Sequence, residues 1–206
     1  MTGNLRQIYK LRRETVLDSL ARSIQDLLTE YLTGIPRIDR IQARAKSVDR
    51  FVGKAEKIEG GVPKYADPIN QIQDQIGARI VGFYLSDISV ISSVIEKYFR
   101  RIEQRTLIPE SEAEFGYFGL HYVLIIPEDV KDPSWSVDLV PEFFELQIKT
   151  VFQHAWSEAS HDIGYKSGSI ELSNDDKRTM AFASAQAWGA DRVFDDIFLR
   201  NQAQQN

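Results

Sequence analysis

The 206-residue sequence contains no cysteine and no long apolar run. The lack of cysteine excludes disulfide bonds, a thiolate nucleophile and cysteine-ligated zinc, and it is typical of proteins from a reducing cytoplasm. No run approaches the roughly 18 apolar residues that a membrane span needs, so we expect no membrane partner. Because the first residues also lack the apolar core of a signal peptide, the sequence predicts a cytoplasmic protein.

The net charge is only −5, but it is unevenly distributed along the chain. Residues 1–57 hold 12 lysines and arginines against 7 acidic residues, whereas the remaining residues hold 13 against 23. A basic first part beside an acidic remainder indicates a local anionic partner rather than a nucleic-acid coat over the whole surface. A solvated helical face is the alternative explanation of the same pattern.

Apolar and polar residues alternate through residues 143–149, which predicts a strand with one apolar face. The other face presents an acid, an amide and a base in succession, namely Glu145, Gln147 and Lys149. From Thr150, a residue type that suits an N-cap, the apolar spacing lengthens to that of a helix. Since ligands of α/β proteins gather at the carboxyl ends of strands, we expect a functional site here.

Hydrophobic periodicity predicts an α/β (α+β) fold with one mixed sheet of about five strands flanked by helices. A long amphipathic helix is expected over residues 5–31, a loop at Gly60–Pro63, and a buried strand over residues 77–84. A helix is expected over residues 87–100, and strands over 101–108 and in the second half of 115–126. The final helix should turn its apolar residues inward, including Trp188, Phe194 and Ile197.

Basic side chains gather before and within a short helix predicted after Ser47. An extended piece carries Arg44 and Lys46 on one side, and Ser47 is a suitable N-cap. Arg50 and Lys54 share a helix face because they are four residues apart. Cations near a helix N-terminus oppose the helix dipole, so the pattern favours a phosphate chain between them. Surface cations on an amphipathic helix are the alternative.

Two further segments carry residues that suit a binding site. Asp74 lies at a predicted helix-to-strand junction, five residues before Arg79, although a lone aspartate there is ordinarily a turn former. Gly116 and Gly119 flank Tyr117, which favours a loop that lets a ligand approach the backbone and leaves an aromatic ring to stack on it. A hairpin with a core tyrosine is the alternative.

Four blocks in this order resemble the synthetase domain of the RelA/SpoT family, the pyrophosphokinases that make alarmone nucleotides. The blocks are Arg44-Ala-Lys46-Ser47 with Lys54, Asp74-Gln-Ile-Gly-Ala-Arg79, Gly116-Tyr117-Phe-Gly-Leu-His121 and Glu145-Leu-Gln147-Ile-Lys149-Thr150. The resemblance covers roughly residues 38–170. It implies a single nucleotidyltransferase-like synthetase domain over residues 1–206, with helical flanks at 1–37 and 171–206.

The resemblance implies transfer of the β,γ-pyrophosphate of ATP to the ribose 3′-hydroxyl of GDP or GTP, which gives (p)ppGpp and AMP. Asp74 and Glu145 would hold Mg²⁺, and Glu145 would also draw the proton from the attacking hydroxyl. The residues implied for ATP are Arg44 and Arg79 around the adenine, and Lys46, Ser47 and Lys54 at the phosphates. The residues implied for the acceptor are Tyr117, His121, Gln147, Lys149 and His154.

The acceptor side departs from the family pattern. Lys149 stands where the family usually has arginine, and Glu112 and Glu114 stand where members that take free GDP or GTP usually have basic residues. Toxin-type relatives that modify the 3′ end of tRNA or adenine nucleotides are therefore an alternative, with an antitoxin as a further partner. A nucleotide-binding regulatory module without turnover is another, and a homo-oligomer is compatible with either kind of small synthetase.

Overall fold

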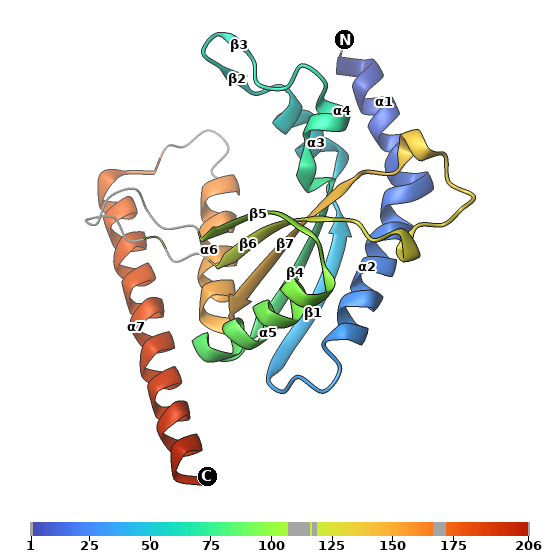
Figure 1. Ribbon diagram of the computed structural model, residues 1–206. Coiled ribbons are helices and arrows are strands. Elements are labelled where there is room, and N and C mark those ends of the chain that lie inside the picture. The colour runs from blue at the N-terminus through green and yellow to red at the C-terminus, as the bar shows by residue number, and fades with distance from the viewer. Residues whose placement is uncertain (1, 107–115, 117–118, 167–171, 206) are drawn as a thin grey trace.

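The computed structural model describes residues 2–106, 116, 119–166 and 172–205. Its centre is a five-stranded sheet in the order β1-β4-β7-β6-β5 (Figure 1). The strands are β1 (Ile38–Ala45), β4 (Ile76–Gly82), β5 (Arg101–Thr106), β6 (Leu120–Ile125) and β7 (Phe143–Thr150). Strands β4 and β7 pair in parallel and the other neighbours pair antiparallel. The mixed sheet of about five strands that the sequence predicts is therefore confirmed.

The central strand β7 has the two faces that its alternation predicts. Phe144, Leu146 and Ile148 are fully buried in the hydrophobic core, and Ile80 of the neighbouring strand β4 joins them. The opposite face carries the polar residues of β7. Because side chains of paired strands point the same way at opposed positions, this polar face continues across the sheet.

Helices of the first half of the chain cover the apolar face of the sheet. They are α2 (Asp18–Tyr31) and α5 (Leu85–Tyr98), and α2 is preceded by α1 (Thr2–Arg12) and a π-helical segment (Arg13–Leu17). The sequence predicts one helix over residues 5–31, and the structure adds the π-helical segment in its middle. Leu20, Ile24 and Leu28 of α2 are fully buried, as their helical spacing requires.

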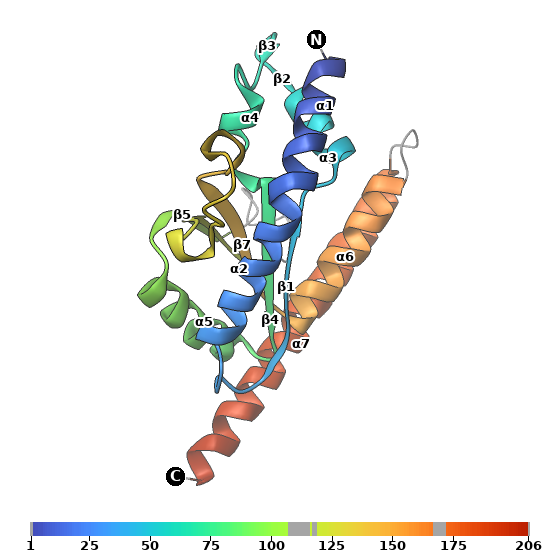
Figure 2. The same ribbon diagram turned by 90° about the vertical axis from the view of Figure 1, so that its right-hand side faces the viewer.

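Helix α6 (Val151–Lys166) follows β7 directly and lies on the polar side of the sheet. Figure 2 shows α2 and α6 on opposite sides of β1 and β4. The predicted N-cap is confirmed by a reciprocal pair of bonds: the Gln153 amide donates to Thr150 Oγ1 at 3.1 Å, and the Thr150 amide donates to Gln153 Oε1 at 2.9 Å. This cap fixes the direction in which the chain leaves the strand.

The final helix α7 (Asn174–Gln205) packs beside α6 and α5. The Thr150 hydroxyl donates to the buried Asp191 carboxylate and so ties α7 to the end of β7. The prediction that the apolar residues of this helix face inward is wrong for Trp188, Phe194 and Ile197, which are 39%, 50% and 42% exposed. Helical spacing identifies the stripe, but α6 and α5 cover only part of it.

The segment between α3 (Val48–Ala55) and α4 (Pro68–Gln71) is a hairpin of β2 (Ile58–Glu59) and β3 (Val62–Pro63). The sequence predicts only a loop here. Gly60 and Gly61 both have positive φ, of 60° and 82°, which suits a tight two-residue hairpin turn. Short 3₁₀ turns cover Gln73–Gln75, Glu128–Val130 and Val137–Leu139. In the described part of the chain, no helix has the length and apolarity needed to span a membrane.

Candidate active site

The register of the five strands arranges the predicted site residues in two adjacent rows on the polar face of the sheet. One row runs across all five strands and contains Arg44, Gly77, Glu145, Val123 and Glu103. The next row contains Gln42, Arg79, Gln147, His121 and Arg105. Residues from all four resembling blocks are therefore neighbours in space, although Arg44 and Gln147 are 103 positions apart in sequence.

A cavity of about 450 Å³ lies over the part of these rows that belongs to β7, β6 and β5. Its lining includes Asp74, Glu145 and His121 of the predicted site, together with Lys54 of α3. The cavity thus joins a carboxylate from the start of β4 to one from the centre of β7. The other lining residues are Lys57, Lys64, Tyr65, Gln71, Gln73, Glu103, Arg105, Tyr122 and Val123.

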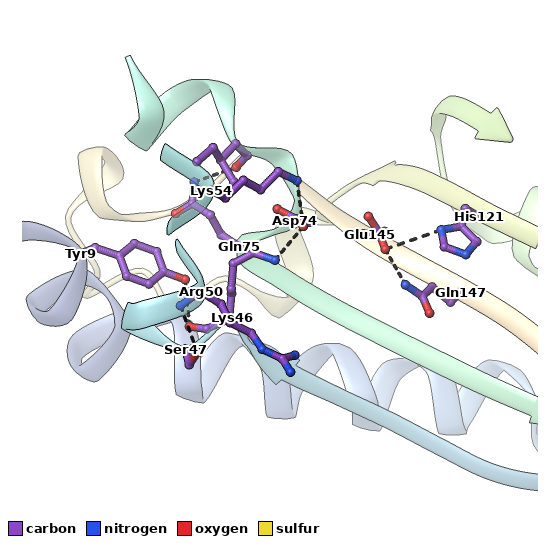
Figure 3. Close-up of polar contacts among 11 residues, drawn as sticks. Tyr9, Lys46, Ser47, Arg50, Lys54, Asp74, Gln75, His121, Glu145 and Gln147 are labelled. Atoms are coloured by element: carbon purple, nitrogen blue, oxygen red, sulfur yellow. Dashed lines mark hydrogen bonds and ion pairs between the residues drawn. The ribbon is translucent and has the colours of Figure 1, made fainter. Parts of the chain in front are cut away.

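Asp74 is the centre of a compact charged cluster. Its Oδ2 lies 2.7 Å from Lys46 Nζ and 2.9 Å from Lys54 Nζ (Figure 3). Burial acts to raise the pKa of Asp74, but the two ammonium groups outweigh it and the pKa is lowered. The second oxygen, Oδ1, is buried and has no hydrogen-bond partner among the described residues. A buried carboxylate oxygen in this position is available to a bound cation.

The N-terminal helix α1 holds the backbone segments that carry this cluster. The Tyr9 hydroxyl donates to the Lys46 carbonyl at 3.1 Å, and the Tyr9 ring stacks on Phe51 of α3 with centroids 3.7 Å apart. Arg12, which is 2% exposed, donates from Nη1 to the Ile69 carbonyl and from Nε to the Leu139 carbonyl, both at 2.9 Å. The segment that carries Asp74 is therefore fixed to α1.

Ser47 is confirmed as the N-cap of α3. Its Oγ accepts a hydrogen bond from the Arg50 amide at 3.3 Å, and its own backbone is extended. The cap fixes α3 so that Lys54 points back to Asp74. Lys46, immediately before the cap, is held by a bond from its amide to the Gln75 carbonyl at 2.8 Å. Local backbone geometry therefore brings the two lysines to one carboxylate.

Glu145 reaches the cavity from the middle of the sheet and is oriented by its neighbours. Gln147 Nε2 donates to Glu145 Oε1 at 2.7 Å, and His121 Nδ1 lies 3.7 Å from the same oxygen. Burial lowers the pKa of His121 despite the nearby carboxylate, so the imidazole is neutral near pH 7. The Glu145 side chain is 27% exposed, which leaves it open to a molecule in the cavity.

Arg44 and Arg79 lie on either side of an open patch of backbone. Gly77 opposes Arg44, which makes Arg79 the diagonal neighbour of Arg44, about 7–8 Å away along the sheet. A Cβ built on Gly77 would meet nothing within 4 Å. Arg79 Nη1 lies 2.9 Å from Glu158 Oε1 and 3.2 Å from His154 Nδ1, both on α6. Both arginines therefore lie on the polar face beside an unobstructed strand position.

This geometry places His154 beside Arg79, on the side predicted for ATP, rather than beside His121. Burial, reinforced by the Arg79 charge, lowers the pKa of His154, so this ring is also neutral near pH 7. Glu158 lies four residues after His154 on the same helix face, a spacing that the sequence shows and that completes the resemblance to the family. The sequence gives it no role of its own, and the structure makes it the ion-pair partner of Arg79.

Lys149 lies on the polar face of β7 but is only 4% exposed and does not line the cavity. Its Nζ donates to Ser157 Oγ of α6 at 3.1 Å, and burial lowers its pKa to about 8. Tyr117 and the acidic positions Glu112 and Glu114 lie outside the described residues. Gly119 is described, and a Cβ there would lie 2.4 Å from the Ile148 carbonyl oxygen.

Several cavity residues were missed by the sequence analysis. Lys57 and Lys64 flank the β2–β3 hairpin, and Arg105 lies on the edge strand β5. The hairpin has a sequence signal, since Gly60-Gly61 between two short apolar segments is typical of a two-residue turn. Arg105 belongs to a strand that was predicted, but only the register with β6 shows that it follows His121 in the same row.

Comparisons with known proteins identify the family and the fold. The family model for the region found in RelA and SpoT proteins matches residues 43–170. GTP pyrophosphokinase YwaC of Bacillus subtilis (strain 168) is 26% identical over 154 residues, which are 73% of this chain and 70% of that protein. Small alarmone synthetase 1 from Bacillus subtilis has the same fold, with a TM-score of 0.72 at 23% identity over 97% of this chain and 98% of that chain. Its complex with its product pppGpp gives a TM-score of 0.70 at 22% identity over 96% and 97%.

Proposed function

The chain belongs to the RelA/SpoT family, and we propose that it is an ATP-dependent pyrophosphokinase. It would transfer the β,γ-pyrophosphate of ATP to the 3′-hydroxyl of GDP or GTP, forming (p)ppGpp and releasing AMP. The observation that carries the proposal is that Asp74, Lys54, Glu145 and His121 line one and the same cavity. The similarity to a GTP pyrophosphokinase and to a synthetase that binds pppGpp also supports it.

Asp74 and Glu145 have the chemistry that Mg²⁺ requires. Mg²⁺ in phosphoryl-transfer sites is held by one or two carboxylates plus the substrate phosphates, and it neutralises charge on the transferred group. Both carboxylates line the cavity, and Asp74 Oδ1 is a buried acceptor without a partner among the described residues. The residues present therefore fit the ion, with Asp74 and Glu145 as its protein ligands.

The donor half would act mainly by binding and orienting ATP. Arg44 and Arg79 would enclose the adenine over the open backbone of Gly77, since guanidinium planes stack on aromatic rings. Lys46 and Lys54 would exchange their shared partner Asp74 for phosphate oxygens. The lysines would thereby place positive charge at the reacting phosphates.

The acceptor half would supply the nucleophile. The 3′-oxygen forms a bond to the β-phosphorus of ATP, the bond from that phosphorus to the α,β-bridging oxygen breaks, and the electron pair leaves with AMP. Glu145 accepts the proton of the hydroxyl, and the Gln147 amide holds the carboxylate in position. Neutral His121 would lie beside the acceptor ribose, able to donate or accept a hydrogen bond.

The cellular context of the proposed enzyme is a cytoplasmic one, where its nucleotide substrates occur. A homo-oligomer, transfer to tRNA and inhibition by an antitoxin are further proposals, each of which comes from the resemblance to small synthetases. Of these, transfer to tRNA bears most directly on the reaction, because it would change the acceptor but not the donor half of the site.

The deciding experiment is incubation of the protein with γ-³²P-labelled ATP, Mg²⁺ and one acceptor at a time. The acceptors are GDP, GTP, ADP, ATP and bulk tRNA, and Glu145→Gln is the matched variant. We expect label on GDP and GTP, and loss of at least 100-fold in rate for Glu145→Gln, as is typical when a positioned proton acceptor is removed. Label on no acceptor, or label that Glu145→Gln does not reduce, would contradict the mechanism. Label on tRNA or adenine nucleotides alone would contradict the guanine-nucleotide acceptor.

A further inference from the structure

A second cavity, of about 220 Å³, lies beside the segment that carries Asp74. Gln73 lines both this cavity and the larger one, whereas Arg12 and Gln75 line only the smaller one. We infer that the smaller cavity binds a small zwitterion, a molecule such as a free α-amino acid that carries a carboxylate and an ammonium group on one carbon atom. Binding of such a molecule involves none of the residues proposed for the reaction.

Arg12 contributes a buried positive charge to this cavity. It is 2% exposed, and among the described residues its guanidinium group donates only to the carbonyls of Ile69 and Leu139. Burial lowers the pKa of Arg12, and the charge of Asp67, which is beyond ion-pair distance, opposes this effect only in part. A buried guanidinium group is costly unless an anion balances it. Two of its five N–H groups are occupied by the two carbonyls, so the group can still donate to a carboxylate in the cavity.

Gln75 provides a buried acceptor beside that charge. Its amide nitrogen donates to the Ile69 carbonyl at 2.7 Å and to the Ile72 carbonyl at 3.0 Å. Because only the nitrogen can donate to two carbonyls, the orientation of the amide is fixed. The oxygen, Oε1, is buried and has no hydrogen-bond partner among the described residues. A buried acceptor without a partner costs free energy, and a donor bound in the cavity would remove that cost.

The two groups are held side by side. Arg12 Nη1 and Gln75 Nε2 both donate to the Ile69 carbonyl oxygen, at 2.9 and 2.7 Å. The neighbouring cation and acceptor therefore match a carboxylate and an ammonium group that are attached to one carbon atom. Exposed Glu142 also lines the cavity, so a simple anion would meet repulsion there, whereas the ammonium group of a zwitterion is attracted.

The size and the apolar part of the cavity suit a short aliphatic side chain. Ile72, which is 2% exposed, lines it together with Val140 and Phe143. Its volume of about 220 Å³ equals that of roughly seven water molecules at about 30 Å³ each. One buried water therefore does not account for the space. An amino acid such as L-valine has both charged groups and an aliphatic side chain to cover the apolar wall.

The test is isothermal titration calorimetry of the full chain without nucleotide or Mg²⁺, in a buffer free of phosphate, carboxylates and primary amines. The ligands are L-valine, isovalerate, which lacks the ammonium group, isobutylamine, which lacks the carboxylate, and inorganic phosphate. The variants are Glu142→Gln and Arg12→Met. Asp138→Asn is the matched control, because Asp138 is an exposed acid on the same connection before β7 and does not line the cavity.

We expect L-valine to bind the wild-type protein at one site per chain, at least tenfold more tightly than the other three ligands. Glu142→Gln should weaken this binding at least threefold, and Asp138→Asn should leave it within twofold. Arg12→Met should weaken it at least tenfold where thermal denaturation shows that the variant is folded. The exposed Glu142 position and the ligand series keep the test decisive where that variant does not fold.

Three outcomes would overturn the inference. Absence of L-valine binding to the wild-type protein would mean that the cavity holds water alone. Equal binding of isovalerate or phosphate would mean that the cavity takes a simple anion. Binding of L-valine that Glu142→Gln does not weaken would place the amino acid elsewhere on the protein. Because no nucleotide is present, each of these outcomes is separate from the result of the transfer assay.

Discussion

Gly77 gives the sharpest test of how the donor half binds a ring. The residue opposes Arg44, has Arg79 as its strand neighbour two positions on, and has no atom within 4 Å of a Cβ built on it. The Cβ of a Gly77→Val side chain therefore meets no steric conflict within the described part of the protein. A β-branched residue in place of strand glycine should raise the free energy of unfolding by roughly 0.5–1 kcal/mol. The methyl groups of the introduced valine would occupy the strand surface on which the adenine is proposed to lie.

We expect Gly77→Val to weaken ATP binding at least tenfold, a loss of about 1.4 kcal/mol, without loss of stability. Isothermal titration calorimetry with a non-hydrolysable ATP analogue measures the affinity, and urea denaturation measures the stability. Gly189→Ala is the control, because a Cβ there also meets nothing within 4 Å but the residue is on α7, away from the cavity. ATP affinity within twofold of wild type in the folded Gly77→Val protein would refute the placement of the ring.

Three more perturbations test the site from other sides. Burial lowers the pKa of Lys149 to about 8 in the folded protein, below its value in the unfolded chain, so unfolding takes up a proton between these values. Urea denaturation measures the free energy of unfolding of the wild type and of Lys149→Met. The difference, wild type minus variant, should rise by about 1–3 kcal/mol from pH 8 to pH 10. A difference that does not change with pH would contradict the burial of Lys149. Gly119→Ala places a Cβ 2.4 Å from the Ile148 carbonyl oxygen and should lose about 1–3 kcal/mol of stability, measured against Gly189→Ala. Asp74→Asn removes the carboxylate that pairs with Lys46 and Lys54. Calorimetry should therefore show tighter ATP binding in EDTA but a smaller increase in ATP affinity when Mg²⁺ is added. Weaker ATP binding in EDTA would contradict the proposal that the two lysines exchange Asp74 for phosphate.

The sequence predicts the elements of the donor half because each depends on local signals. Ser47 is a cap by residue type, and the alternation of residues 143–149 defines the two faces of β7. The register between strands is not local. It places Arg105 beside His121, and it places Gly77 between two arginines, and no pattern within either strand contains that information.

Burial of a polar side chain is a second property that the sequence pattern does not reveal. Lys149 alternates with Glu145 and Gln147 and should share their exposure, yet it is 4% exposed because α6 covers the end of β7 and provides Ser157 as its partner. The reverse holds on α7, where Trp188 has the spacing of a buried residue but remains 39% exposed. Both depend on how far one helix covers its neighbour, which is set by tertiary packing.

The N-terminal helix supports the Asp74 cluster, although it lies outside the matched region, residues 43–170. Tyr9 binds the Lys46 carbonyl, and Arg12 binds the carbonyl of Ile69, five residues before Asp74. Both are almost completely buried, so their hydrogen bonds are protected from water and would be costly to leave unmade. The positions of Lys46 and Asp74, whose partners are proposed to change on ATP binding, therefore depend on one helix. A change in how α1 packs would therefore affect the backbone positions of both charged residues.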